Sequence, residues 1–317
     1  MKFWAAAVLG WMVWGAQAQQ QVPAPIERQE PARPLPQGPT IRAESRLVNV
    51  ALNVTDEHGA PVAGLTREDF VVKEDGKPLG IAFFEKESAT PLEIVIAVDA
   101  SESTFAESKL EREACRRFVR SLVREQDSVA LLSFADDVTE VVPFTNDLKR
   151  VDAGFAQIKR GEATALYDAV YLAGERLQEA PAKAGARKVI VLITDGENTV
   201  HHGSYPAALE QAERAGAMVY SLIVVPVEAD AGRNTGGEHA LMQMAKDTGG
   251  KFYEIYQKKD VALAFDHVSD DLRTQYTLGY YAPRKGIGDA GLRHISVEMK
   301  DGSLKYGLRY RTAYYAR

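Results

Sequence analysis

The sequence contains a single cysteine, Cys115, among its 317 residues, which excludes an internal disulfide. It also lacks a stripe of clustered lysine and arginine, and its formal net charge is −6. Nucleic-acid backbones are bound by clustered cations, so this composition argues against nucleic acid as a partner. We find no Gly-x-Ser-x-Gly elbow, no phosphate-binding Gly-x-x-x-x-Gly-Lys loop and no His-Glu-x-x-His zinc helix. The familiar signatures of hydrolases and nucleotide-binding enzymes are therefore missing.

Only the N-terminus carries a long apolar run. Lys2 precedes an apolar stretch over residues 3–15, and Ala16-Gln17-Ala18 forms a small-x-small cleavage site. These features predict a signal peptide over residues 1–18 and an exported protein, without a transmembrane anchor once the signal is removed. An exported protein without disulfides is typical of a bacterial cell envelope, so we expect a secreted or periplasmic location.

The rest of the chain divides by composition and periodicity. Residues 19–42 carry six prolines and predict an extended linker. Residues 43–90 alternate apolar and polar side chains, as in Val48 to Val54, which predicts half-buried strands. In this segment we expect a small antiparallel sheet in which residues 70–73 and 81–84 flank a turn at Asp75-Gly76.

Residues 91–273 show a different pattern, in which buried strands alternate with amphipathic helices. We expect strands near 93–98, 128–134, 188–194, 217–225 and 251–255, and helices near 106–124, 147–158, 166–179, 205–215, 238–247 and 260–273. This alternation predicts an α/β fold with a doubly wound, mostly parallel sheet covered by helices on both faces. The segment 138–144 follows the preceding strand too closely for a crossover helix, so we expect an antiparallel edge strand there. Cys115 lies on the apolar side of the helix at 106–124 and should be a buried thiol.

Residues 274–317 return to alternation. Residues 295–299 and 304–310 flank Asp301-Gly302, which predicts a hairpin. Neither β segment has enough strands to bury a core alone, so we expect the two to fold together as one small antiparallel β domain. The α/β domain would then be an insertion between the halves 43–90 and 274–317.

Two carboxylates follow the most apolar strands of the α/β segment. Asp99 ends the run that begins at Ile94, and Asp195 comes just after the run 189–193. Both runs predict central strands, and the carboxyl ends of neighbouring parallel strands are where doubly wound sheets bind ligands. Oxygen ligands without cysteine or histidine favour a hard cation such as Mg²⁺ over zinc or copper.

Three motifs resemble the von Willebrand factor type A (VWA) domain. Val98-Asp99-Ala100-Ser101-Glu102-Ser103 matches its DxSxS element, Gly161 to Asp168 looks like its threonine-bearing loop, and Ile193-Thr194-Asp195-Gly196-Glu197 resembles its TDG element. The resemblance covers about residues 92–273. The flanking β segments resemble a bacterial group, abundant in acidobacteria, that is described only as containing a domain related to VWA. The resemblance implies a VWA, Rossmann-like α/β fold.

For function, the resemblance implies a metal-ion-dependent adhesion site that binds Mg²⁺ or Mn²⁺. Its metal ligands would be Asp99, Ser101, Ser103, Thr164 and Asp195. An Asp or Glu carboxylate of a protein partner would complete the coordination of the metal, so the chain would be a binding module and not an enzyme.

Two alternatives stay open. In the first, the protein is a structural envelope scaffold in which the metal only braces the loops. In the second, it is a Mg²⁺-dependent phosphatase of the haloacid-dehalogenase type, which also places an Asp after the first central strand. That chemistry needs a second Asp two residues later as general acid, and this chain has Ser101 there.

Overall fold

The computed structural model describes residues 46–86, 90–101, 108–180, 186–200, 202–225, 235–283 and 291–316. Glu44–Arg317 form one compact unit. The predicted signal peptide and linker lie outside the described residues. Within the described residues, no helix has the length and apolarity needed to span a membrane.

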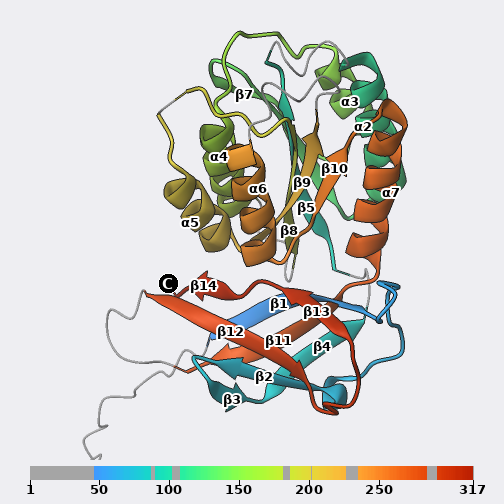
Figure 1. Ribbon diagram of the computed structural model, residues 1–317, viewed down its shortest axis with the longest axis vertical. Helices are drawn as coiled ribbons and strands as arrows, with labels where there is room; N and C mark the ends of the chain where they lie inside the picture. Colours follow the sequence, from blue (N-terminus) through green and yellow to red (C-terminus); the bar gives the residue numbers. More distant parts are fainter. Residues whose placement is uncertain are drawn as a thin grey trace, which may run out of the picture. The chain divides into compact units, whose positions relative to one another are not determined.

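The α/β layer is built on one six-stranded sheet (Figure 1). In spatial order its strands are β10 (Phe252–Ile255), β9 (Ala217–Val224), β8 (Arg187–Thr194), β5 (Leu92–Asp99), β6 (Ser128–Phe134) and β7 (Val138–Thr145). The first five are parallel to their neighbours. β7 pairs with β6 in the antiparallel sense, which confirms the predicted edge strand.

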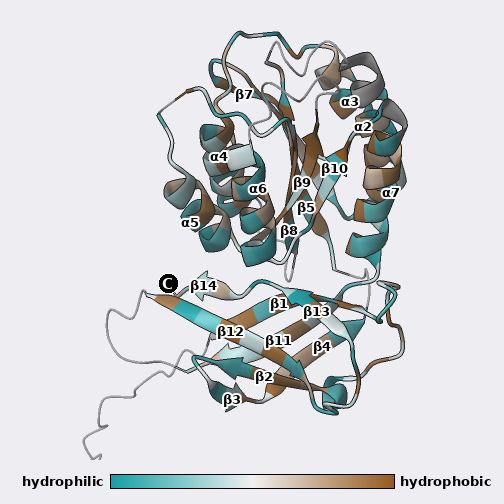
Figure 2. Cartoon of the chain, viewed as in Figure 1, coloured by the Kyte–Doolittle hydropathy of each residue, from teal (hydrophilic) through white to brown (hydrophobic). Residues whose placement is uncertain are grey.

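Helices cover both faces of this sheet (Figure 1). One face carries α2 (Ser108–Leu122), α3 (Leu148–Phe155) and α7 (Lys258–Arg273), and the other carries α4 (Leu166–Glu179), α5 (Tyr205–Ala215) and α6 (Thr235–Thr248). Every residue of β5 is buried, since Ile94 and Ile96 face the first group of helices while Val95 and Ala97 face the second. The uniformly hydrophobic central strands are visible in Figure 2. Cys115 is buried in α2, as expected.

The remaining strands form two four-stranded antiparallel sheets that share one hydrophobic core. The first sheet has the order β13 (Gly307–Tyr310), β1 (Arg46–Thr55), β11 (Tyr276–Ala282) and β4 (Ile81–Lys86). The second has the order β14 (Ala313–Tyr315), β12 (Leu292–Met299), β2 (Phe70–Glu74) and β3 (Lys77–Leu79), and a short 3-10 helix, η1 (Arg67–Asp69), precedes β2. β1 pairs with β11, and β2 pairs with β12. Strands from before and after the α/β segment thus complete the same sheets.

Two predicted strand pairings are wrong. β12 and β13 do not form a hairpin across Asp301-Gly302, because β12 pairs with β2 and β14 while β13 pairs with β1 in the other sheet. Likewise, the strand that pairs with β2 across Asp75-Gly76 is β3, and β4 pairs with β11. In both cases the turn is present. The chain crosses to the other sheet of the β layer with β13 in the first case, and with β4, after β3, in the second.

Candidate metal centre

The two predicted carboxylates lie at the carboxyl ends of adjacent strands. Asp99 is the last residue of β5 and Asp195 follows β8, and these strands are paired in parallel up to Val98 and Ile193. Both carboxylates are buried, with 4% of Asp99 and 7% of Asp195 exposed. The parallel register therefore brings two buried acidic groups to one edge of the sheet.

Hydrogen bonds fix the Asp99 carboxylate on both oxygens. Its Oδ1 accepts from the Ser101 backbone N–H at 2.9 Å, and its Oδ2 accepts from the Thr194 hydroxyl at 2.7 Å. The Ser101 side chain also forms a hydrogen bond with this carboxylate. Ser101 itself is 2% exposed. Ser103 lies outside the described residues, so its position in the site stays a prediction.

The loop that carries Thr164 is tied to the first loop and to β6. The Gly161 N–H donates to the Ala100 carbonyl at 3.1 Å, and the Asp136 carboxylate accepts from the backbone N–H groups of Glu162 and Ala163, each at 3.2 Å. A Cβ at Gly161 would lie 2.2 Å from Asp136 Oδ2, so only glycine allows this approach. Asp136 thereby holds the Thr164 loop against the end of β6.

The third loop, residues 195–200 after β8, is hydrogen-bonded to the other two. The Thr164 N–H donates to the Thr199 hydroxyl at 2.8 Å, and the Thr199 N–H donates back to the Thr164 carbonyl at 3.0 Å. The Asp195 carboxylate accepts from the Glu197 N–H at 3.1 Å. With the bond from Thr194 to Asp99, the three loops are hydrogen-bonded to one another in a ring.

The sequence did not single out Asp136, Thr194 or Thr199 as residues of the site. Asp136 and Thr194 could have been noticed, because both stand at the carboxyl end of a buried strand, as Asp99 does. Thr199 carries no such signal, since its role depends on a loop 35 residues earlier. Asp168, the last residue of the predicted threonine-bearing loop, lies in the first turn of α4.

The electrostatics of the site favour a cation. Burial raises the pKa of Asp99 to about 6, against the hydrogen bonds from Ser101 and Thr194, and the negative charge of Asp195 adds to the rise. A cation would offset this unfavourable burial of negative charge, although it would compete with protons below about pH 6.

The available donors fit a hard cation. Among the described residues, no group of three or more His, Cys, Asp and Glu side chains is arranged to hold a metal ion. A cation held by the predicted ligands would be bound by two carboxylates together with hydroxyls and water. Mg²⁺ and Mn²⁺ accept such oxygen ligands, whereas zinc and copper favour nitrogen and sulfur.

A family model described as the von Willebrand factor type A domain matches residues 93–271, from β5 to near the end of α7. No curated protein matches the sequence.

Among solved structures, the conserved hypothetical protein BatB from Bacteroides thetaiotaomicron is 23% identical to this chain, with a TM-score of 0.44. The alignment covers 56% of this chain and 99% of the BatB chain. An aerotolerance-related membrane protein from Bacteroides fragilis is 25% identical over 56% of this chain and 98% of its own, with a TM-score of 0.43. A von Willebrand factor type A protein from Catenulispora acidiphila is 10% identical over 86% of this chain and 74% of its own, with a TM-score of 0.48. At these TM-scores the structures add no argument to the family model.

Proposed function

Since the chain belongs to the von Willebrand factor type A family, whose model matches more than half of its length, we propose that it is an exported protein-binding module with a metal-ion-dependent adhesion site. Asp99, Ser101, Ser103, Thr164 and Asp195 would hold Mg²⁺ or Mn²⁺. The partner would be a protein that presents an Asp or Glu carboxylate. The observation that carries the proposal is the ring of three hydrogen-bonded loops around two buried carboxylates.

The described residues of the site have distinct roles in this proposal. The backbone of Thr164 is fixed through both its N–H and its carbonyl, which would hold its hydroxyl in position for the cation. Asp99 is oriented by Ser101 and Thr194 before any cation arrives. When bound, the cation supplies an electrophilic contact for an outside carboxylate. Hydroxyl ligands carry no formal charge, so they leave the cation able to attract that anion.

The geometry weighs against the scaffold alternative. A metal that only braced the loops would be needed where the loops lack other links, but these three loops are already joined by backbone and side-chain hydrogen bonds. The phosphatase alternative is weakened because Ser101 stands where that chemistry needs a general acid.

Titration calorimetry of the purified protein with MgCl₂ and MnCl₂ tests the metal. We expect binding at millimolar concentrations or below, weakened about ten-fold or more by Thr164→Ala and regained in Thr164→Ser. Thr139→Ala on the exposed edge strand β7 is the matched control and should bind as the wild type does. No uptake of either metal at millimolar levels would refute the proposal.

The partner is tested by a pull-down from bacterial envelope extract with Mg²⁺ or with EDTA. We expect capture by the wild type in Mg²⁺ and its loss both in EDTA and in Thr164→Ala. Under the scaffold alternative, Mg²⁺ would raise the melting temperature while Thr164→Ala captured the same partner as the wild type.

A further inference from the structure

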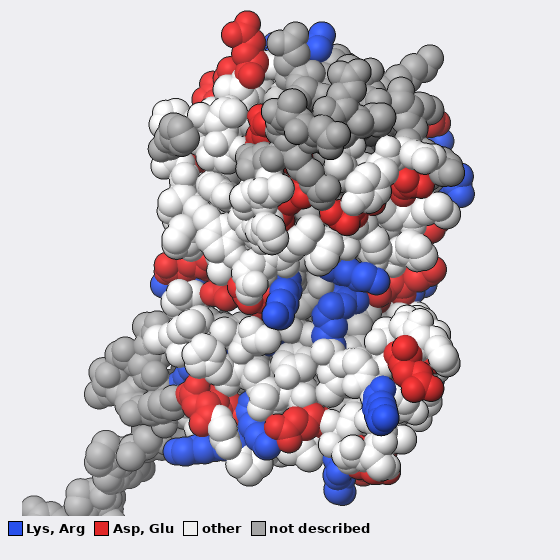
Figure 3. All heavy atoms as spheres, viewed as in Figure 1, with Lys and Arg blue, Asp and Glu red and all other residues white. Residues whose placement is uncertain are grey.

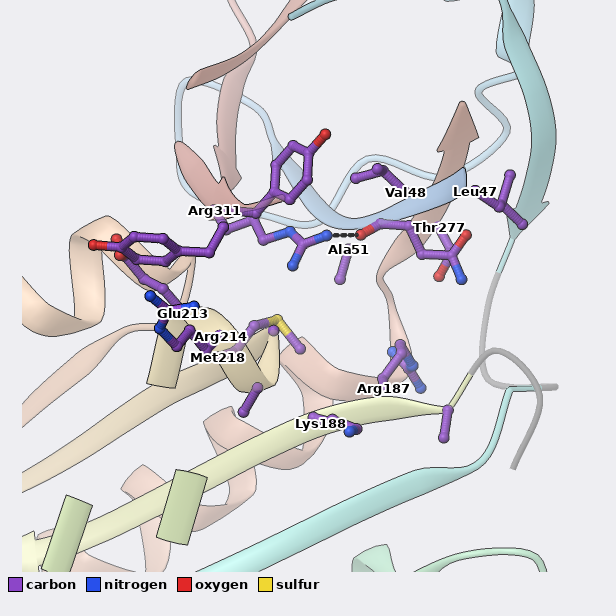
Figure 4. Close-up of a pocket in the computed structure, with 16 residues that line it drawn as sticks. Leu47, Val48, Ala51, Arg187, Lys188, Glu213, Arg214, Met218, Thr277 and Arg311 are labelled. Atoms are coloured by element: carbon purple, nitrogen blue, oxygen red, sulfur yellow. Dashed lines mark hydrogen bonds between the residues drawn. The ribbon is translucent and has the colours of Figure 1, made fainter. Parts of the chain in front are cut away.

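A second candidate site is a cavity of about 230 Å³ between the β layer and the α/β layer (Figure 4). On one side it is lined by β1, β11 and the chain around β14, and on the other by β8, β9 and the end of α5. Arg187, the first residue of β8, lines the cavity, whereas Asp195 follows the last residue of that strand. At about 3.3 Å per residue the two are roughly 26 Å apart, so the cavity is separate from the candidate metal centre.

Charged side chains of both signs lie in and around the cavity. Figure 3 shows Lys and Arg atoms next to Asp and Glu atoms where the helices approach the β-sheets. Three arginines of the lining each have an acidic neighbour: Arg214 with Glu210 at 2.6 Å, Arg187 with the buried Asp127, and Arg311 with Glu213. The lining therefore does not require a charged ligand, and a neutral polar compound is compatible with it.

Two lining residues on opposite sides of the cavity contain buried polar atoms that lack a hydrogen bond. The side-chain oxygen of Asn49, on β1, and Nε of Arg187, on β8, have no hydrogen-bond partner among the described residues. Arg187 as a whole is 6% exposed. A buried acceptor and a buried donor are both unfavourable when unpaired, so a ligand that carries both kinds of group would gain from pairing them.

Thr277 and Glu213 add a hydroxyl and a carboxyl group to the lining. Thr277 of β11 lies across the cavity from Arg187 in Figure 4. It pairs with Ala51 of β1, so Asn49, two residues before Ala51, points to the same face of the sheet. Burial raises the pKa of Glu213 to about 7, so near neutral pH its carboxyl group is partly protonated and can donate as well as accept.

The rest of the lining includes apolar groups, and the size of the cavity limits the ligand. The apolar lining residues include Leu47, Val48, Ala51, Ala215 and Met218. The volume is below the roughly 300–1,000 Å³ of sites for drug-sized ligands and above the roughly 150 Å³ that holds a benzene molecule. The space therefore suits one six-membered ring with its substituents.

We propose that this cavity binds one sugar unit, either as a free monosaccharide or as the end of a glycan. Each sugar hydroxyl has one donor and two acceptor positions, so a neutral sugar can pair both the Asn49 oxygen and the Arg187 N–H without adding charge. The C–H groups of the ring would pack against the apolar lining. Tyr281, which is 55% exposed and pairs with Leu47, would contact the next unit of a glycan.

Titration calorimetry of the full chain tests the site with glucose, galactose, mannose and N-acetylglucosamine as separate probes. EDTA is present, so that no sugar is bound through a metal. We expect at least one sugar to bind with a Kd of about 1 mM or below, which a ligand of about twelve heavy atoms reaches at an ordinary ligand efficiency. The methyl glycoside of that sugar distinguishes the two sources: equal affinity indicates the end of a glycan, and loss of binding indicates a free monosaccharide.

Two variants remove hydrogen-bonding atoms from the lining. Thr277→Val removes the hydroxyl with little change of shape, and Asn49→Leu removes the unpaired oxygen. Each should weaken binding about ten-fold. The melting temperature of Asn49→Leu should stay close to that of the wild type, because the lost oxygen has no hydrogen bond among the described residues. Thr139→Val, the same change on the exposed edge strand β7, should bind as the wild type does.

Two results would overturn the proposal. One is the absence of binding of all four sugars at about 10 mM. The other is equal binding by the wild type, Asn49→Leu and Thr277→Val, which would place the sugar elsewhere on the protein. Thr164→Ala should leave sugar binding unchanged, so a failure of this proposal is distinguishable from a failure of the metal site.

Discussion

Asp136 is a single exposed residue on which the geometry of the Thr164 loop depends. Its carboxylate accepts from two consecutive backbone amides of that loop. We expect Asp136→Ala to weaken Mg²⁺ binding about ten-fold, because loss of groups that orient metal ligands commonly costs ten- to a hundred-fold in affinity. Calorimetry measures this change. Asp137→Ala removes the neighbouring exposed carboxylate and keeps the backbone bond from Ala135 to Asp137, so its affinity should be unchanged.

Glu213 of α5 makes the stability of the folded state depend on pH. Its pKa is about 7 in the folded protein against an ordinary value of 4.5. Between these values the folded state binds more protons than the unfolded state, so the contribution of Glu213 to stability falls as pH rises from 4.5 to about 7. Urea unfolding at several pH values should show that the free energy of unfolding falls less steeply with rising pH in Glu213→Gln than in the wild type. An identical slope in Glu213→Gln and the wild type would contradict the prediction, and Glu298→Gln controls for loss of a carboxylate.

The sequence predicts the position of a single residue when that position follows from the order and direction of the strands. Asp99 and Asp195 could be placed together because parallel strands bring their carboxyl ends to one edge. The contacts between the layers could not be predicted, since pairs such as Asn53 and Gln275 meet only after the β layer has packed against the α/β layer. No periodicity in the sequence reports that contact.

Among the elements, α5 shows why some boundaries are predictable to the residue. Ser204 caps its N-terminus, Pro206 occupies the first turn, and Gly216 ends the helix with φ of 70°. Each of these residues has a local preference for its position. The predicted pairing of β12 with β13 is wrong for a different reason. The alternation of apolar and polar residues shows which side chains face the core, but not which strand lies beside a given strand.

Gly249, at the end of α6, tests the contact between two elements of different layers. It has φ of 76°, and an added Cβ would lie 2.4 Å from the backbone of Tyr310 and Arg311. We expect Gly249→Ala to lower the free energy of unfolding by about 2–4 kcal/mol, from backbone strain and overpacking together. Urea denaturation provides the measurement. Gly302→Ala, where a Cβ meets nothing within 4 Å, should change stability little.

For the whole molecule, we expect the β layer and the α/β layer to unfold together. Asn53 of β1 donates to the Asp271 carbonyl of α7 at 3.0 Å and accepts from the Gln275 side chain at 2.8 Å, and Gln275 also accepts from Arg187 of β8. These buried bonds join both layers at one point. Damage to the core of the β layer should therefore destabilise the helices as well.

Arg293→Met tests this coupling. Arg293 and Glu74 form a buried ion pair, 4% and 2% exposed, and Tyr280 and Tyr314 donate to the same carboxylate. Removing one partner of such a pair costs about 3–5 kcal/mol. Far-ultraviolet circular dichroism should show the helices melting at the same lowered temperature as the β layer, which is followed by the fluorescence of a Tyr281→Trp reporter on β11. Helices that melt as in the wild type would contradict the coupling.

The neighbouring Lys73→Met is the control for that experiment. Lys73 pairs with Glu298 at an exposed position, and such pairs contribute about 1 kcal/mol or less. Its melting temperature should remain close to that of the wild type by both signals.

The interleaving of β1 between β11 and β13 has a consequence for biosynthesis. Both neighbours of β1 come from the last stretch of the chain, after Gln275. Until the ribosome has made β11 and β13, β1 lacks the two strands with which it pairs in the folded protein. Its backbone amides and apolar side chains then remain exposed to water or bound by a chaperone. Maturation of this half of the protein is thus post-translational, and a chain that stops before the carboxyl-terminal strands leaves the first strand permanently without neighbours.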